Sequence, residues 1–174
     1  MADITKVLVD DHLRVKRLLT NYEQSPWRLD LALNVCNELK MHNTIEEEIF
    51  YPAVRDAIDE RLIDESEDEH AQVEEIMAAI EDMDPGDPAL ERTMRMLRSA
   101  LTKHIDREEN VVFAKANVEL ANELLEMGRE AFARRQELMG AGVSGDAGPS
   151  LSMGTANVGW RTRGIKSATA NLGW

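Results

Sequence analysis

The sequence has few of the residues that stabilise secreted or membrane-spanning proteins. Cys36 is the only cysteine among 174 residues, so no disulfide can form within one chain and a secreted disulfide scaffold is excluded. No apolar run approaches the roughly 20 residues that a membrane-spanning helix needs. The first residues, MADITKVLVDDH, lack the basic start and apolar stretch of a secretion signal. We therefore expect a cytoplasmic protein.

Positive charge is also scarce. The chain has 20 Lys and Arg against 33 Asp and Glu, for a formal net charge of −13. This charge disfavours nucleic acid and anionic membrane surfaces, and we expect neither as a partner. Residues 140–174 hold one acid and three bases, so the acidic excess lies in residues 1–139.

Aromatic residues make up only 5% of the chain, whereas apolar residues recur at the three- and four-residue spacing of amphipathic helices. We expect an all-α fold, an antiparallel up-down four-helix bundle with an additional C-terminal helix. Pro52 is expected to kink the second helix. The expected helices cover residues 3–22, 25 to at least 50, 62–83, 88 to at least 111, and 117–139.

The apolar spacing also predicts which residues face the core. The stripe of the second helix is expected to continue through Ile49 and Ala53, and that of the fourth helix through Val111. The last helix is expected to have an apolar face made of Val118, Leu120, Leu124, Leu125, Phe132 and Leu138.

Residues 140–174 form a glycine-rich tail in the expected organisation, after a bundle domain at 1–139. They contain eight of the ten glycines and a repeat, TANVGW at 155–160 and TANLGW at 169–174. The composition is typical of a flexible tail. The repeated tryptophan also suits docking, either onto the bundle or onto a second subunit, which would give a homo-oligomer.

Histidine is rare as well, but its placement follows a pattern. Each of the four expected bundle helices carries one histidine, and three histidines are followed four residues later by a glutamate. Residues four apart lie on the same face of a helix. The candidate metal ligands are His12, His42, Glu46, His70, Glu74, His104 and Glu108.

These residues allow two interpretations. A histidine on an apolar stripe is often an ordinary core residue, and a glutamate four residues away often forms a surface ion pair. The three glutamates, however, share the apolar stripes of their histidines, where an uncompensated carboxylate would be costly. One histidine on each helix also lets all four meet in one layer of the core, as in bundle metal sites. Imidazole and carboxylate suit iron, manganese or zinc, and seven ligands suit two ions.

Four segments resemble the ligand helices of the hemerythrin-like, or HHE cation-binding, family. They are DDHLRVKRLL, HNTIEEEIFYP, DEHAQVEEI and HIDREENVVFAKA, within about residues 3–115. The chain most resembles bacterial, especially mycobacterial, members, some of which decompose hydrogen peroxide. The resemblance implies a four-helix bundle around two iron ions with an oxo or hydroxo bridge. It implies that the four histidines bind iron and that Glu46 and Glu108 bridge the two ions.

Glu74 departs from the pattern of the oxygen-carrying members, which have a second histidine at this position of the third helix. Because an anionic oxygen donor favours iron(III), we expect redox turnover rather than reversible oxygen binding. The expected function is a catalase-like reaction with hydrogen peroxide, or a reaction with dioxygen, in which Glu74 is the catalytic carboxylate that shifts or relays a proton. The alternatives are an oxygen, nitric oxide or redox sensor, an iron homeostasis protein, and a bundle with purely structural metals.

Five other polar residues near these motifs receive no assigned role, although Tyr22 and Tyr51 could donate hydrogen bonds to the ligands. Glu47 and Glu48 point away from the stripe and are expected to be solvated charges. Tyr22 and Tyr51 lie more than one turn from the ligand layer, and Arg107 lies on another face of its helix.

Overall fold

The computed structural model describes residues 2–142, which fold into helices and connecting loops with no strand among them. This confirms the expected all-α class. The α-helices are α1 Ile4–Gln24, α2 Leu29–Ile45, α3 Tyr51–Val54, α4 Glu60–Glu81, α5 Leu90–Arg107, α6 Phe113–Glu119 and α7 Leu124–Gly142. Two π-helical turns interrupt them, η1 at Glu46–Phe50 and η2 at Glu108–Val112.

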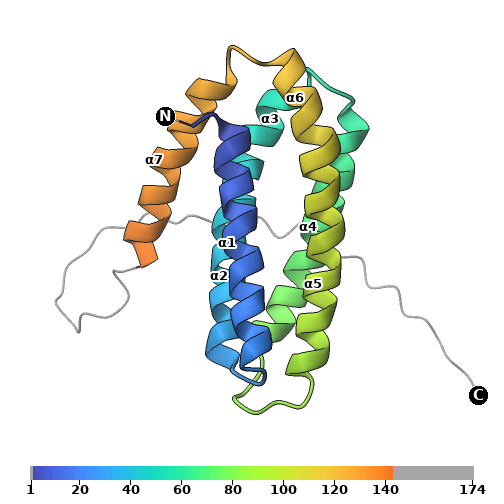
Figure 1. Ribbon diagram of the computed structural model, residues 1–174, viewed down its shortest axis with the longest axis vertical. Coiled ribbons are helices and arrows are strands. Elements are labelled where there is room, and N and C mark those ends of the chain that lie inside the picture. Colours follow the sequence, from blue (N-terminus) through green and yellow to red (C-terminus); the bar gives the residue numbers. More distant parts are fainter. Residues whose placement is uncertain (1, 143–174) are drawn as a thin grey trace, which may run out of the picture.

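Helices α1, α2, α4 and α5 run side by side with alternating directions and form the four-helix bundle (Figure 1). The short helices α3 and α6 lie at the end of the bundle where α1 begins. Helix α7 packs on the outside of this bundle against α1 and α2. The expected additional C-terminal helix is therefore present, and it continues past Gly140 to Gly142. The remainder of the expected tail, with its repeat, lies outside the described residues.

The first helix begins as expected and ends later than expected. The Asp3 side chain caps α1 by accepting a hydrogen bond from the Lys6 backbone N–H at 3.1 Å. Ser25 was expected to start the second helix, but its backbone N–H instead donates to Tyr22 O at the end of α1. Trp27 has a φ of 70°, and this left-handed residue lets the chain reverse before α2 begins at Leu29.

The π-helical turn η1 shifts the buried stripe of the second helix by one residue. In a regular α-helix with 3.6 residues per turn, each step of four residues drifts by about 40° around the axis. The extra residue of a π turn offsets this drift, so Glu46, Phe50 and Val54 all stay buried. The expectation for Ile49 and Ala53 was wrong, because Ile49 is only partly buried and Ala53 is exposed.

The second π turn, η2, has the same effect on the fourth bundle helix. Glu108, Val112 and Ala116 follow at steps of four residues and are all buried. Val111, which a regular α-helix would bury, is only partly buried. Each π turn therefore begins at a candidate metal ligand and re-aims the residues that follow it.

Helix α7 buries only part of the expected apolar face, since Leu124 is buried as expected but Phe132 is not. Leu124, Met127 and Ala131 are buried, whereas Phe132 is 54% and Val118 is 76% exposed. The reason is that α6 ends at Glu119 and a turn precedes α7, so the two segments do not share one helical register.

Helix α7 also passes close to the start of the chain. A side chain at Gly128 would collide with the backbone of Ala2 and Asp3. Glycine at this position therefore allows the helix to lie against the residues that lead into α1.

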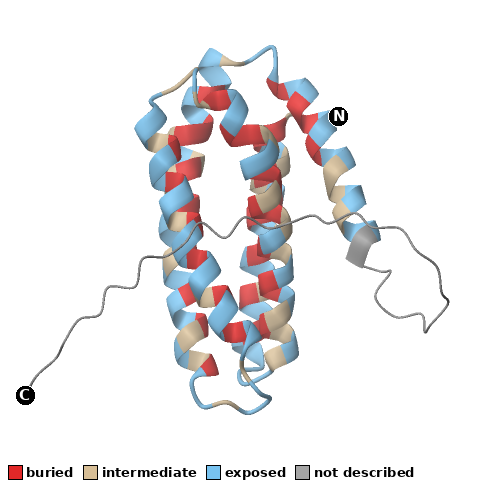
Figure 2. Ribbon diagram, turned by 180° about the vertical axis from the view of Figure 1, so that it is seen from behind, coloured by how far each residue is buried: buried red, intermediate tan, exposed pale blue. Residues whose placement is uncertain are grey.

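Buried residues line the inner faces of the bundle (Figure 2) and form two apolar clusters. Along α1, Leu8 belongs to one cluster and Val15 to the other; along α2, Ile45 and Leu39 divide in the same way. The histidines lie between these pairs, so a polar layer separates the two clusters. None of the helices within residues 2–142 has the length and apolar character of a membrane span.

Candidate metal centre

The bundle brings six of the seven candidate ligands into one buried layer. The histidines come from four helices, His12 from α1, His42 from α2, His70 from α4 and His104 from α5. Glu46 and Glu108 are the first residues of η1 and η2. All six side chains are buried, and both glutamates are fully inaccessible to solvent. The predicted convergence of these six residues is what the structure shows.

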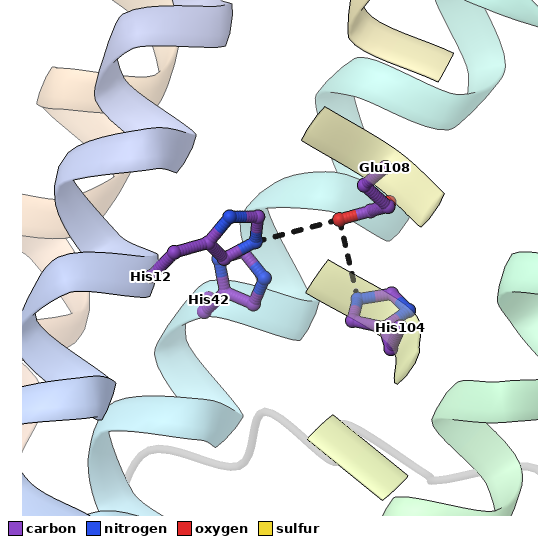
Figure 3. Close-up of side chains that lie close together, drawn as sticks. All are labelled: His12, His42, His104 and Glu108. Carbon is purple, nitrogen blue, oxygen red and sulfur yellow. Dashed lines mark ion pairs between the residues drawn. The ribbon is translucent and has the colours of Figure 1, made fainter. Parts of the chain in front are cut away.

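Glu108 lies between histidines from two helices (Figure 3). Its Oε2 is 3.4 Å from His12 Nε2 and 3.2 Å from His104 Nε2. With His42, these residues each offer one ligand atom within 4.8 Å of the others. The group has three imidazoles and one carboxylate, a donor set typical of iron, zinc or manganese sites.

Glu46 occupies the equivalent position on the other side of the layer. Its Oε2 is 3.1 Å from His42 Nε2 and 3.2 Å from His70 Nε2. Glu46, His70 and His104 form a second group of converging donors, which shares His104 with the first. Two adjoining groups of this kind suit two metal ions.

The buried donor atoms also lack other partners. Within the described part of the chain, five of them make no hydrogen bond: His12 Nε2, His42 Nε2, His104 Nε2, Glu46 Oε1 and Glu108 Oε2. Buried polar atoms without partners are costly. Bound cations would satisfy them, so these residues fit a metal centre.

Glu74 does not share this layer. The expectation that it lies on the buried stripe of His70 was wrong, because its side chain is exposed. Helix α4 has no π turn, so Val73 and Met77 continue the buried stripe and Glu74 is rotated out of it. Glu74 instead lines a groove of about 870 Å³ together with Glu47. Burial and the negative charge of Glu47 raise the pKa of Glu74.

Each histidine faces a second carboxylate on the side away from the layer. These outer carboxylates lie near the Nδ1 atoms and leave the Nε2 atoms directed inward. The distances from Nδ1 are 2.9 Å for His12 to Glu109, 3.8 Å for His42 to Asp11, 2.8 Å for His70 to Glu47 and 3.3 Å for His104 to Glu69. In metalloproteins such contacts set the tautomer and orientation of the ligating imidazole.

Three of the residues left unassigned from the sequence contact this centre. Glu47 was expected to be solvated, but it contacts His70. Arg107 donates to Glu69 at 3.0 Å and so lies behind His104. Glu48 forms a surface ion pair with Arg134, as a solvated charge would.

Tyr51 is the third of these residues, and its displacement of more than one turn from the ligand layer had argued against a role. Its hydroxyl lies 2.7 Å from Glu108 Oε1, 3.3 Å from Glu46 Oε2 and 3.2 Å from His70 Nε2. The π turn η1 precedes Tyr51 directly, and the long side chain spans the distance to the layer. Tyr22, by contrast, packs in the apolar cluster at the far end.

Burial and neighbouring charges shift the pKa values of several side chains in the layer. Burial would lower the pKa of His70 and His104, but the neighbouring carboxylates raise these pKa values to about 9 and about 10. Burial would raise the pKa of Glu108, but the positive charges of the neighbouring His104 and His12 hold it well below the usual range. Burial and the charges of Glu46 and Glu108 raise the pKa of Tyr51 well above its ordinary value. The hydroxyl of Tyr51 therefore keeps its proton.

Comparisons with known proteins agree with this geometry. The family model described as hemerythrin HHE cation binding domain matches residues 3–116. A solved hemerythrin HHE cation binding domain-containing protein from Mycobacterium kansasii superposes with a TM-score of 0.72 at 27% identity, over 82% of this chain and 91% of that chain. A DNA nickase from Nostoc is 26% identical over 148 residues, which are 83% of this chain but only 42% of the nickase.

Proposed function

The chain belongs to the hemerythrin HHE cation-binding family, and from this we propose that it is a non-haem di-iron protein that reacts with hydrogen peroxide or dioxygen. The main activity that we propose is a catalase-like decomposition of hydrogen peroxide. The observation that carries the proposal is the buried layer of four imidazoles and two carboxylates, in which five inward atoms make no hydrogen bond among residues 2–142.

The four imidazoles and the carboxylates of Glu46 and Glu108 would together hold the two iron ions, since each carboxylate already contacts histidines from two helices. The iron pair would supply the exchange of electrons that peroxide decomposition requires.

The remaining residues of the site control protons and water. Tyr51 holds a proton on its hydroxyl at 2.7 Å from Glu108, within reach of the layer. The two apolar clusters on either side exclude bulk water from the donors. Glu74 was expected to relay a proton, but its exposed position lies outside the layer, so we assign the held proton to Tyr51.

The similarity to the nickase does not extend the proposal to DNA. The chain spans less than half of that protein's length, and its net charge of −13 opposes binding to a polyanion. We therefore keep hydrogen peroxide and dioxygen as the proposed partners.

The test uses the full chain loaded with iron(II) under anaerobic conditions. We expect about two irons per chain, and oxygen release from peroxide above that of an equal amount of free iron. Glu108→Gln should lose most of this activity, because a neutral amide is a poor ligand between two cations. Binding of fewer than about two irons would overturn the di-iron assignment. A stable oxygen or nitric oxide adduct without turnover would indicate a sensor, and weak, reversible iron binding would indicate iron homeostasis.

A further inference from the structure

Helix α7 lies beyond the residues that match the family model, which end at 116, yet it packs on two helices that carry histidines. We propose that Arg135 of α7 is a positioning residue for the metal centre and acts on His42 through Asp11. The proposal rests on the proposed function, because it requires that His42 binds metal.

The first step of this path is an ion pair between α7 and α1. Arg135 Nη1 donates to Asp11 Oδ1 at 2.8 Å, and Arg135 also pairs with Glu38 of α2. The Asp11 carboxylate is fully buried. Its other cation is Arg14, which is 35% exposed, whereas Arg135 is only 12% exposed. A buried carboxylate depends on such partners to remain charged and fixed in place.

The second step leads from Asp11 to the metal layer. Asp11 Oδ2 lies 3.8 Å from His42 Nδ1. Neither atom has a hydrogen-bond partner elsewhere in the described chain, so each is the nearest available polar partner of the other. On the opposite side of the ring, His42 Nε2 lies 3.1 Å from Glu46. A carboxylate held beside Nδ1 keeps the proton on that nitrogen and leaves the lone pair of Nε2 for the metal.

Two of the other three outer carboxylates are held by cations from the bundle. Arg107 of α5 holds Glu69 at 3.0 Å, and Lys16 of α1 lies 3.4 Å from Glu109. Those cations come from the bundle helices themselves. At Asp11, one of the two arginines comes from α7, so the docking of this fifth helix is linked to one particular histidine.

Helix α7 also provides a matched control. Arg134 is adjacent to Arg135 and forms an ion pair with Glu48 of η1 at 2.7 Å. Glu48 contacts no histidine in the hydrogen bonds and ion pairs of residues 2–142. Arg134→Ala therefore removes a neighbouring, more exposed ion pair between α7 and the bundle without touching the path to His42.

The experiment measures iron(II) affinity by competition with a chelator in the full chain. We expect Arg135→Ala to weaken binding at one of the two iron sites by about tenfold, and Arg134→Ala to change it by less than about twofold. Nitrogen-15 NMR of the metal-free protein should show a mixed tautomer for the His42 ring in Arg135→Ala alone. The ring is identified by the loss of its signals in His42→Gln.

Asp11→Asn tests whether Arg135 acts through the proposed residue. We expect the double variant Asp11→Asn/Arg135→Ala to bind iron as tightly as Asp11→Asn alone. If Arg135 acts only through Asp11, then removing Arg135 has no further effect once Asp11 is replaced. Additive losses would overturn the path through Asp11. If Arg135→Ala does not fold, Arg135→Lys compared with Arg134→Lys replaces the pair of alanine variants, with the same site-specific weakening expected.

Two further results would overturn the inference. One is wild-type affinity at both sites in a folded Arg135→Ala protein, and the other is an equal loss in Arg134→Ala. A wild-type chain that takes up no iron would instead refute the proposed function, so the two failures are distinguishable.

Discussion

Replacing Tyr51 with phenylalanine removes one oxygen atom from the centre of the buried layer. The ring of Tyr51 is buried among apolar residues, and a phenylalanine ring would keep this packing. The hydroxyl has three polar neighbours but only one proton to donate. That proton goes to Glu108, whose Oε1 at 2.7 Å is the nearest. The variant therefore tests a single hydrogen bond to a buried carboxylate.

The cost of this change follows from the charge of the acceptor. A hydrogen bond to a charged group contributes about 1.5–3 kcal/mol, and a buried partner left unsatisfied adds to the loss. We expect Tyr51→Phe to lower the free energy of unfolding of the metal-free protein by about 2 kcal/mol. For a bundle of this size, that corresponds to a decrease in Tm of roughly 6 °C.

The assay is thermal unfolding followed by circular dichroism, in the presence of a chelator. Tyr22→Phe is the matched control. Tyr22 is also buried, but its hydroxyl makes no hydrogen bond to a carboxylate within residues 2–142, so its loss should change the Tm by no more than about 2 °C. An unchanged Tm for Tyr51→Phe, or an equal decrease for Tyr22→Phe, would refute the assigned hydrogen bond.

Three further results are expected. The Glu74→Ala variant should bind as much iron as the wild type, measured by elemental analysis, because the Glu74 side chain is exposed. A lower iron content would show that Glu74 is a metal ligand after all. The metal-free protein should lose stability as the pH rises from about 6.5 through 10, because His70 and His104 bind protons more tightly when folded, with pKa values raised to about 9 and about 10. Thermal unfolding across this range checks the trend, and a flat profile would contradict it. Gly128→Ala should destabilise the protein by about 1–3 kcal/mol in chemical denaturation, because its methyl group meets backbone atoms, whereas Gly140→Ala has open space and should not.

The sequence predicted the burial of the two histidine–glutamate pairs that begin on the second and fourth bundle helices because two independent patterns agreed. His42 and Glu46, like His104 and Glu108, lie four residues apart on apolar stripes, and both pairs are buried in the structure. The same spacing misled for Glu74. Apolar residues around it alternate steps of three and four, which is the register of a regular helix, and this register places Glu74 outside the stripe.

The position of Tyr51 depends on a feature that residue spacing shows only weakly. The buried residues Glu46, Phe50 and Val54 follow at repeated steps of four, which a regular α-helix cannot keep on one face. Such a run indicates a π turn. Ile49 is also apolar, however, and a regular helix without a π turn could bury it in place of Phe50. Only packing decides between the two registers.

The outer carboxylates were beyond the reach of local pattern altogether. Glu109 contacts His12 and Glu69 contacts His104 across different helices. With 33 acidic residues in the chain, nothing in their immediate neighbourhood distinguishes these from solvated surface charges. Their role depends on how neighbouring helices are aligned.

The polar layer between the two apolar clusters has a consequence for how the protein unfolds. Without metal, each half of the bundle has its own apolar core, and the layer that joins them contains ionisable rather than apolar side chains. We expect hydrogen exchange to reveal two units of different stability in the metal-free chain, one for each cluster. Ligands from all four helices would couple these units once metal binds, so that the two halves open together. The centre that we propose for chemistry would then also determine the folding cooperativity of the bundle.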